Sequence, residues 1–111
     1  MARLIWAAPA LADLDEIAEY IALDDRPAAA RYVRRAFDTV DRLKQFPDSG
    51  RRLAELPDSR YREVVVPPCR VFYRTEGNSV FVLYVMRSER LLHSHLLESR
   101  HRRTERLEDC T

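Results

Sequence analysis

The chain has 111 residues, with 19 Lys and Arg against 18 Asp and Glu, so its formal net charge is only +1 at pH 7. This length suits one domain with one modest core, and no apolar run is long enough to span a membrane. The N-terminus also lacks the apolar core of a secretory signal, so we expect a cytoplasmic protein. Cys69 and Cys110 show no spacing that indicates a disulfide framework.

The first half of the chain predicts a short strand and two helices. Residues 3–6 form a short apolar run, which is a candidate strand. Apolar residues then recur at helical spacing in two stripes that we expect to be buried, with solvated acidic positions such as Asp13 between them. Asp25 and Pro27 predict the cap and the first residue of the second helix. The first stripe is Leu11, Leu14, Ile17, Ala18 and Ile21, and the second is Ala29, Val33, Ala36, Phe37, Val40 and Leu43.

The segment from residue 61 to residue 90 predicts three strands. Residues 64–66, 71–73 and 80–86 are rich in β-branched and aromatic side chains, which suit a half-buried sheet. Pro67 and Pro68 lack the N–H group that a ladder needs, so they end the first of these strands. Gly77 lies in a candidate hairpin turn. Residues 80–86 are apolar on both faces, so we expect a central strand covered on one side and close to a groove on the other.

The basic residues are almost all arginine, because Lys44 is the only lysine. They gather in the middle of the chain and again near its end, whereas the acidic residues gather in the two predicted helices. Biased codon usage is one explanation. The other is a basic face that meets nucleic acid or an acidic protein partner. Residues 98–111 are strongly polar, so we expect them to fray or to extend the last helix.

The predicted order of strand, helical hairpin, meander and C-terminal helix resembles the RelE/ParE superfamily of bacterial toxins. The segment Phe46-Pro47-x-x-Gly50-Arg51 is similar to the loop after the hairpin in the ParE branch, residues 70–74 to its central strand, and residues 80–90 to the strand and arm that follow. The opening W-x-x-P-A-x-A-D-L-x-x-I-x-x-Y is similar to the start of the same branch, here Trp6, Pro9, Ala10, Asp13, Leu14, Ile17 and Tyr20.

This resemblance covers nearly the whole chain and implies an α+β fold. An N-terminal strand and an α-hairpin would pack on a small, mostly antiparallel sheet of three to four strands, followed by a short C-terminal helix. Residues 1–97 would form the single domain, and residues 98–111 an Arg-rich tail that is partly disordered or extends the helix.

The superfamily implies two different activities, since RelE-like members cleave messenger RNA in the ribosome and ParE-like members inhibit DNA gyrase. RNA cleavage needs a base, an acid and cations at the phosphate. Arg62 and Arg70 match two basic positions, but Val64 stands where a third is expected. Ser88 and Ser94 fall where a catalytic arginine and a tyrosine would sit. These departures favour gyrase inhibition with no catalytic residue. The alternative is a ribosome-dependent endoribonuclease that uses Arg62, Arg70, Arg87 or Arg90, and His93 or His95.

The resemblance also implies a cognate ParD-like antitoxin, bound to the toxin in a hetero-oligomer. The candidates for contact with the antitoxin or the target are Arg62, Arg70, Tyr73, Arg74, Tyr84, Arg87 and Arg90. The arginines could equally be solvated residues of a small sheet, and the two tyrosines fit the core or a groove wall better than catalysis. A degenerate toxin that serves only as a scaffold for its antitoxin is a third alternative.

No cofactor or metal is expected from the sequence. His93 and His95 are the closest pair of candidate ligands. Residues two apart on a strand point to the same face, but two ligands do not complete a site and no third ligand has suitable spacing.

Overall fold

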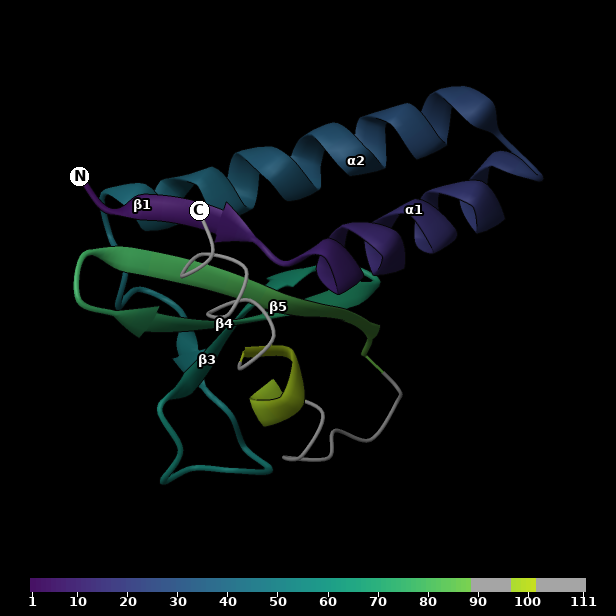
Figure 1. Ribbon diagram of the computed structural model, residues 1–111. Helices are drawn as coiled ribbons and strands as arrows, with labels where there is room; N and C mark the ends of the chain where they lie inside the picture. The colour runs from purple at the N-terminus through teal and green to yellow at the C-terminus, as the bar shows by residue number, and fades with distance from the viewer. Residues whose placement is uncertain (89–96, 102–111) are drawn as a thin grey trace.

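The computed structural model describes residues 1–88 and 97–101 (Figure 1). Two helices follow the first strand, and a meander of longer strands forms the second half. A short helical turn at residues 97–101, the C-terminal helical segment, completes the described part of the chain. The elements are β1 (Arg3–Trp6), α1 (Ala8–Ala22), α2 (Arg26–Asp41), the 3-10 turn η1 (Arg42–Lys44), β2 (Arg51–Arg52), β3 (Tyr61–Val66), β4 (Cys69–Glu76) and β5 (Ser79–Arg87).

Within the described residues, five strands form one sheet in the order β1-β5-β4-β3-β2. β1 runs parallel to β5, and every other neighbouring pair is antiparallel. The α+β fold is therefore as expected, with one more strand than the three to four expected. The additional strand is β2, in which Arg51 and Arg52 pair with Glu63 and Arg62 of β3. Two consecutive arginines carry no β-strand signal, so only the pairing with β3 reveals this strand.

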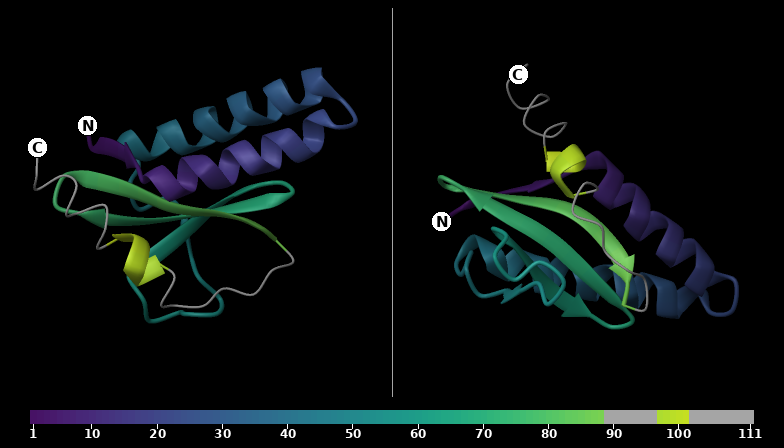
Figure 2. Two further views of the ribbon diagram at one scale, coloured as in Figure 1. Left: turned by 45° about the vertical axis from the view of Figure 1, so that its right-hand side comes forward. Right: turned by 90° about the horizontal axis from the view of Figure 1, so that it is seen from below.

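The helical hairpin of α1 and α2 covers one face of the sheet, and the C-terminal helical segment lies on the opposite face (Figure 2). Asp25 caps α2 as predicted, because its side chain accepts a hydrogen bond from the Ala28 N–H at 3.1 Å. The helix begins at Arg26, so Pro27 is its second residue and not its first.

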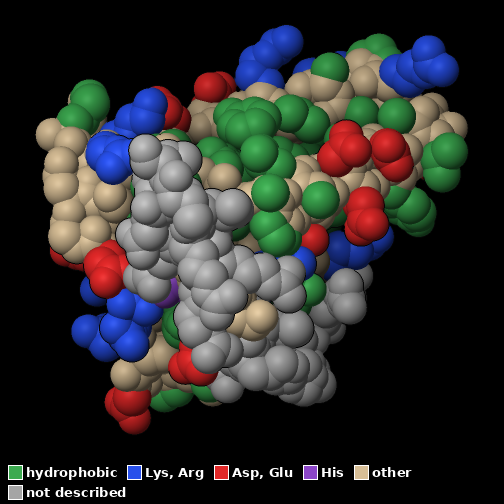
Figure 3. Space-filling view, in the orientation of Figure 1, with side chains coloured by type: hydrophobic (Ala, Val, Ile, Leu, Met, Phe, Trp, Pro, Cys, Tyr) green, Lys and Arg blue, Asp and Glu red, His purple; other side chains and the backbone are tan. Residues whose placement is uncertain are grey.

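Two members of the predicted helical stripes are exposed. Leu11 and Phe37 are 41% and 40% exposed, whereas Leu14 and Val40 lie in the core. The buried stripe of α1 runs instead through Ala10 and Leu14. The exposed Phe37 ring packs against Trp6, with ring centroids 5.0 Å apart. On the face shown in Figure 3, hydrophobic side chains accordingly gather over the hairpin.

β5 is buried on both faces over most of its length, as a strand between β1 and β4 should be. Its register shifts at Leu83, because Phe72 pairs with Tyr84 while Tyr73 pairs with Val82. This β-bulge bends the strand. β1 pairs only with residues 79–82 of β5, so among the described residues no strand lies beside the outer edge of β5 after the bulge.

Candidate functional site

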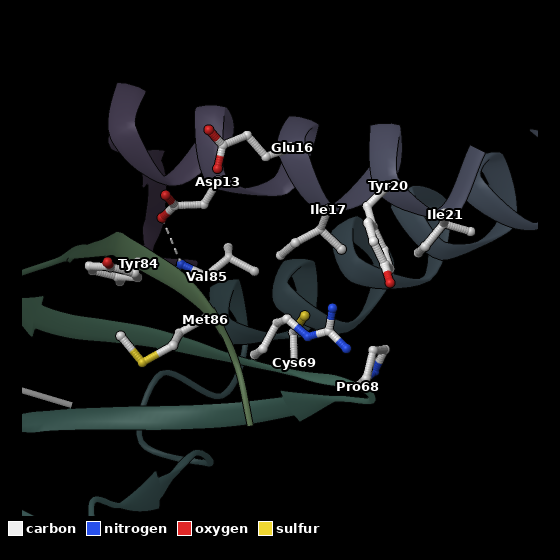
Figure 4. A pocket seen from close by; sticks show the side chains of 11 residues that line it. Asp13, Glu16, Ile17, Tyr20, Ile21, Pro68, Cys69, Tyr84, Val85 and Met86 are labelled. Carbon is white, nitrogen blue, oxygen red and sulfur yellow. Dashed lines mark hydrogen bonds between the residues drawn. The ribbon is translucent and has the colours of Figure 1, made fainter. Parts of the chain in front are cut away.

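Where β1 ends, α1 runs beside the outer edge of β5 and leaves a pocket of about 290 Å³ between the two elements (Figure 4). The floor of this α1–β5 pocket is apolar, with Asp13 and Glu16 at the end farther from Pro68. Arg87 lies at the other end, with its guanidinium carbon 5.4 Å from the centroid of the Tyr20 ring. The residues that line the pocket are Asp13, Glu16, Ile17, Tyr20, Ile21, Pro68, Cys69, Tyr84, Val85, Met86 and Arg87.

Asp13 joins three parts of the molecule at the edge of this pocket. Its Oδ2 accepts a hydrogen bond from the Val85 N–H at 3.1 Å, drawn in Figure 4, and another from Arg100 Nη1 at 2.5 Å. Arg100 also donates to the Leu83 carbonyl at 3.0 Å, and its guanidinium carbon stands 3.6 Å from the centroid of the Tyr84 ring. Charged side chains thus bind the backbone of β5 at and after the bulge, where β1 no longer pairs with it.

The opposite face of the sheet holds a network of ion pairs around Arg70. Arg70 Nε donates to Glu63 Oε2 at 2.7 Å, and its two Nη atoms donate to the carboxylate of Glu55 at 2.7 Å and 2.8 Å. Arg51 donates to the other oxygen of Glu63 at 2.6 Å. The hydrogen bond from Arg70 lowers the pKa of the Glu55 carboxyl, and the bond to Glu55 raises the pKa of the Arg70 guanidinium. Arg70 is therefore matched by two carboxylates of its own chain.

Arg62 and Arg74 also have partners within the chain. Arg62 donates to the Gly50 carbonyl at 2.9 Å, and the buried Arg74 lies 2.7 Å from Nδ1 of His101.

Tyr73, a candidate surface contact, has no exposed surface. It is a core residue whose hydroxyl donates to the Pro47 carbonyl at 2.8 Å and accepts from the Gly50 N–H at 2.9 Å. Burial raises the pKa of this hydroxyl. Tyr73 thus lies in the core, one of the two positions expected for it, and a partner could reach it only if the sheet opened.

The described residues contain neither a candidate metal site nor a helix that could span a membrane. Among residues 1–88 and 97–101, no group of three or more His, Cys, Asp or Glu side chains could hold a metal ion. No helix in this part of the chain is long and apolar enough to cross a bilayer.

The family model for the ParE toxin of the type II toxin–antitoxin system parDE matches residues 4–92. The chain belongs to the ParE toxin family. It is 35% identical to toxin RelE2 of Caulobacter vibrioides over 92 residues, which are 82% of this chain and 100% of that relative. It is 51% identical over 49 residues, 44% of the chain, to Y4kP, a candidate toxin of Sinorhizobium fredii, and this match spans about half of that relative (51%).

A solved structure agrees with this assignment to the ParE toxin family. A chain of the chromosomal ParDE toxin–antitoxin system from P. aeruginosa matches this ParE-family chain with a TM-score of 0.69 at 26% sequence identity. The match covers 80% of this chain and 98% of that chain.

The residues predicted to contact the antitoxin or the target do not form one cluster in this ParE-family toxin. Tyr84 and Arg87 line the α1–β5 pocket. Arg62, Arg70 and Arg74 lie on β3 and β4 with partners of their own. Arg90, His93 and His95, which were also predicted as site residues, lie outside the described residues.

The sequence predictions missed the roles of Asp13 and Arg100. Asp13 belongs to the quoted opening motif, but its place among the acidic positions of the first helix predicted a solvated side chain. Arg100 was assigned to the polar tail expected from residue 98 onward, yet it forms an ion pair with Asp13. The helix also continues through this boundary to His101, which is buried.

Proposed function

We propose that this ParE-family chain is the toxin of a type II toxin–antitoxin module, that it inhibits DNA gyrase, and that a cognate ParD-like antitoxin neutralises it in a hetero-oligomer. Gyrase is a cytoplasmic target, so the proposal places the toxin in the cytoplasm. The observation that carries the choice of gyrase inhibition over RNA cleavage is the pairing of Arg70 with Glu55 and Glu63.

A ribonuclease of this superfamily needs cations that can approach the scissile phosphate. Arg70 matches one of the expected cations, but its guanidinium already donates to two carboxylates, and the Glu63 side chain is only 4% exposed. A phosphate at this position would have to displace both carboxylates and would meet their negative charge. Releasing Arg70 would also leave Glu63 with one fewer partner in a buried position, which is costly.

The second candidate function is ribosome-dependent RNA cleavage. The relative that matches over its whole length at 35% identity carries the name RelE2, which favours this alternative. In this reading Arg62 would supply a cation, since its Nη1 donates to the Gly50 carbonyl and its Nε lies 4.0 Å from the nearest Asp48 oxygen, a looser ion pair than those of Arg70.

We further propose that a segment of the antitoxin occupies the α1–β5 pocket. The solved ParDE system that this chain resembles supports a protein partner. An apolar pocket between a helix and a strand suits the apolar side chains of a bound peptide segment. The charges favour a basic residue of that segment near Glu16 and an acidic one near Arg87.

The decisive experiment measures gyrase supercoiling and gyrase-dependent DNA cleavage with the purified toxin, alone and with the antitoxin expressed from the neighbouring small reading frame. The expected result is lost supercoiling or trapped cleaved DNA, and full reversal by the antitoxin. The antitoxin alone is the control. Unaffected gyrase, together with messenger RNA cut on translating ribosomes, would refute gyrase inhibition and establish the alternative.

A further inference from the structure

A buried histidine holds the C-terminal helical segment against the sheet. The His101 side chain is only 2% exposed, and its ring packs 5.1 Å from the ring of Phe81 on β5. Nδ1 lies 2.7 Å from Nη1 of Arg74, and Nε2 lies 3.3 Å from Oε2 of Glu76. Leu97, one helical turn earlier, is also buried. Both ends of the described segment are therefore anchored, and one anchor is a histidine, the side chain whose ordinary pKa lies closest to neutral pH.

The contact with Arg74 determines the protonation state of His101. A guanidinium has only N–H donors and no acceptor, so the nitrogen at 2.7 Å must accept through a lone pair. Nδ1 therefore carries no proton, the ring is neutral, and its one proton is on Nε2, on the side of Glu76. If Nδ1 were protonated, its N–H group would face an N–H group of Arg74, and both side chains would be positively charged. The contact would then be repulsive.

The charged groups around His101 come from two elements. Arg74 and Glu76 belong to β4, Arg60 comes from the loop before β3, and β5 contributes the uncharged ring of Phe81. Burial, then Arg74 and then Arg60 lower the pKa of His101, while Glu76 opposes them. The Glu76 side chain is half exposed, so water screens its attraction, and the lowering effects prevail.

We propose that residues 97–101 form a pH-responsive latch on the sheet, closed while His101 is neutral and accepts from Arg74, and opened when His101 is protonated. Opening uncovers Phe81, leaves Arg74 with its 3.7 Å ion pair to Glu76 in place of His101, and separates Arg100 from Asp13. This regulation is independent of which target the toxin acts on.

The direction of the pH dependence follows from the lowered pKa. A released His101 regains its ordinary pKa of about 6.5, so it binds a proton more readily than the latched residue does. The closed state is fully favoured above about pH 6.5 and loses stability as the pH falls from there toward the pKa of the latched residue. In that window the ratio of open to closed molecules rises by up to about tenfold per pH unit, which is the limit for one proton.

The test uses the full-length protein and NMR spectroscopy between about pH 7.5 and about pH 5. The ring carbons of His101 report its pKa, and the methyl resonances of Leu97 report whether the segment is docked. We expect a His101 pKa below about 6.5 and a docked population that falls as His101 titrates. In His101→Gln the amide oxygen can accept from Arg74 at every pH, so its docked population should stay constant over this range.

Two results would overturn the proposal. The first is a His101 pKa at or above about 6.5, the ordinary value, in the wild-type protein. The second is a Leu97 signal that shows the same pH dependence in the wild type and in His101→Gln. The pKa measurement needs no variant, so it decides the matter even if His101→Gln does not fold.

Discussion

Gly50 is a position where a single added methyl group has no room. A Cβ at this residue would lie 2.5 Å from the hydroxyl oxygen of Tyr73 and 2.7 Å from the carbonyl oxygen of Glu63. We expect Gly50→Ala to lower the free energy of unfolding by about 1–3 kcal/mol, because overpacking forces neighbours to shift. Urea unfolding followed by circular dichroism measures the change.

A substitution at Gly77 is the control for Gly50→Ala, because at Gly77 the backbone dihedral angle, and not a lack of space, limits which residues fit. A Cβ there meets nothing within 4 Å, but the residue has a φ of +57°. Asn tolerates this conformation better than other residues with a Cβ, so Gly77→Asn should stay close to the wild type. A Gly50→Ala protein as stable as Gly77→Asn would contradict the close packing against Tyr73.

The ion pair between Asp13 and Arg100 predicts a second effect at a single residue. Asp13→Asn removes the charge that Arg100 faces and leaves one amide oxygen to serve both Arg100 and the Val85 N–H. We expect a loss of about 1–3 kcal/mol in the free energy of unfolding, the range for hydrogen bonds to charged groups in partly buried positions. Urea unfolding measures this loss.

Asp15→Asn, on the exposed side of the same helix, should change stability by less than about 0.5 kcal/mol and serves as the control for Asp13→Asn. Equal losses in both variants would show that helix charge, and not the contact with Arg100, is responsible.

The sequence predicted some residues of the candidate site and missed others for a physical reason. Tyr84 and Arg87, both candidates from the sequence, line the pocket, and the strand that carries them was expected beside a groove because it is apolar on both faces. Arg100 was missed because its partners Asp13 and Leu83 are 87 and 17 residues away in the chain. Nothing in the local polar pattern distinguishes a paired arginine from a solvated one.

At the level of elements, the cap of α2 can be tested separately from the core. Asp25→Ala removes the side-chain oxygen that accepts from the Ala28 N–H, which should cost about 1 kcal/mol and lower the melting temperature. Asp24→Ala, one residue earlier and outside the cap position, should leave the melting temperature nearly unchanged. Thermal unfolding followed at the helical signal compares the two, and identical melting temperatures would argue against the cap.

The sequence predicted the helices and strands whose side chains follow a regular pattern along the chain. It did not predict features that exist only because two strands pair with each other. The hairpin of α1 and α2 and the strands β3, β4 and β5 show helical spacing or runs of β-branched residues. β2 has only two residues, both arginine, and exists through its ladder to β3. The bulge in β5 also depends on two strands together, so no pattern within β5 could indicate it.

At the scale of the whole molecule, the proposed binding of the antitoxin predicts that exposed aromatic residues are not equivalent. Tyr20 is 63% exposed and lines the α1–β5 pocket, whereas Phe46 is 61% exposed and lies outside that pocket. Tyr20→Ala should weaken antitoxin binding by about tenfold or more, as expected for an aromatic anchor worth about 1.4 kcal/mol. Phe46→Ala is the control and should bind normally.

Isothermal titration with the purified antitoxin compares these variants, and the rise in melting temperature on binding gives an independent measure. Equal affinity of Tyr20→Ala and the wild type would place the antitoxin elsewhere on the toxin. Equal weakening in both variants would indicate a general effect of lost aromatic surface.

The shortness of β1 has a further consequence for how copies of this toxin behave at high concentration. A strand edge without a neighbour invites another chain to pair with it, and proteins commonly block such edges with charge. Asp13 and Arg100 occupy the backbone groups of Val85 and Leu83, so a second sheet cannot dock there by main-chain hydrogen bonds without first displacing an ion pair. The contact that ties the C-terminal helical segment to α1 therefore also protects the toxin against edge-to-edge aggregation.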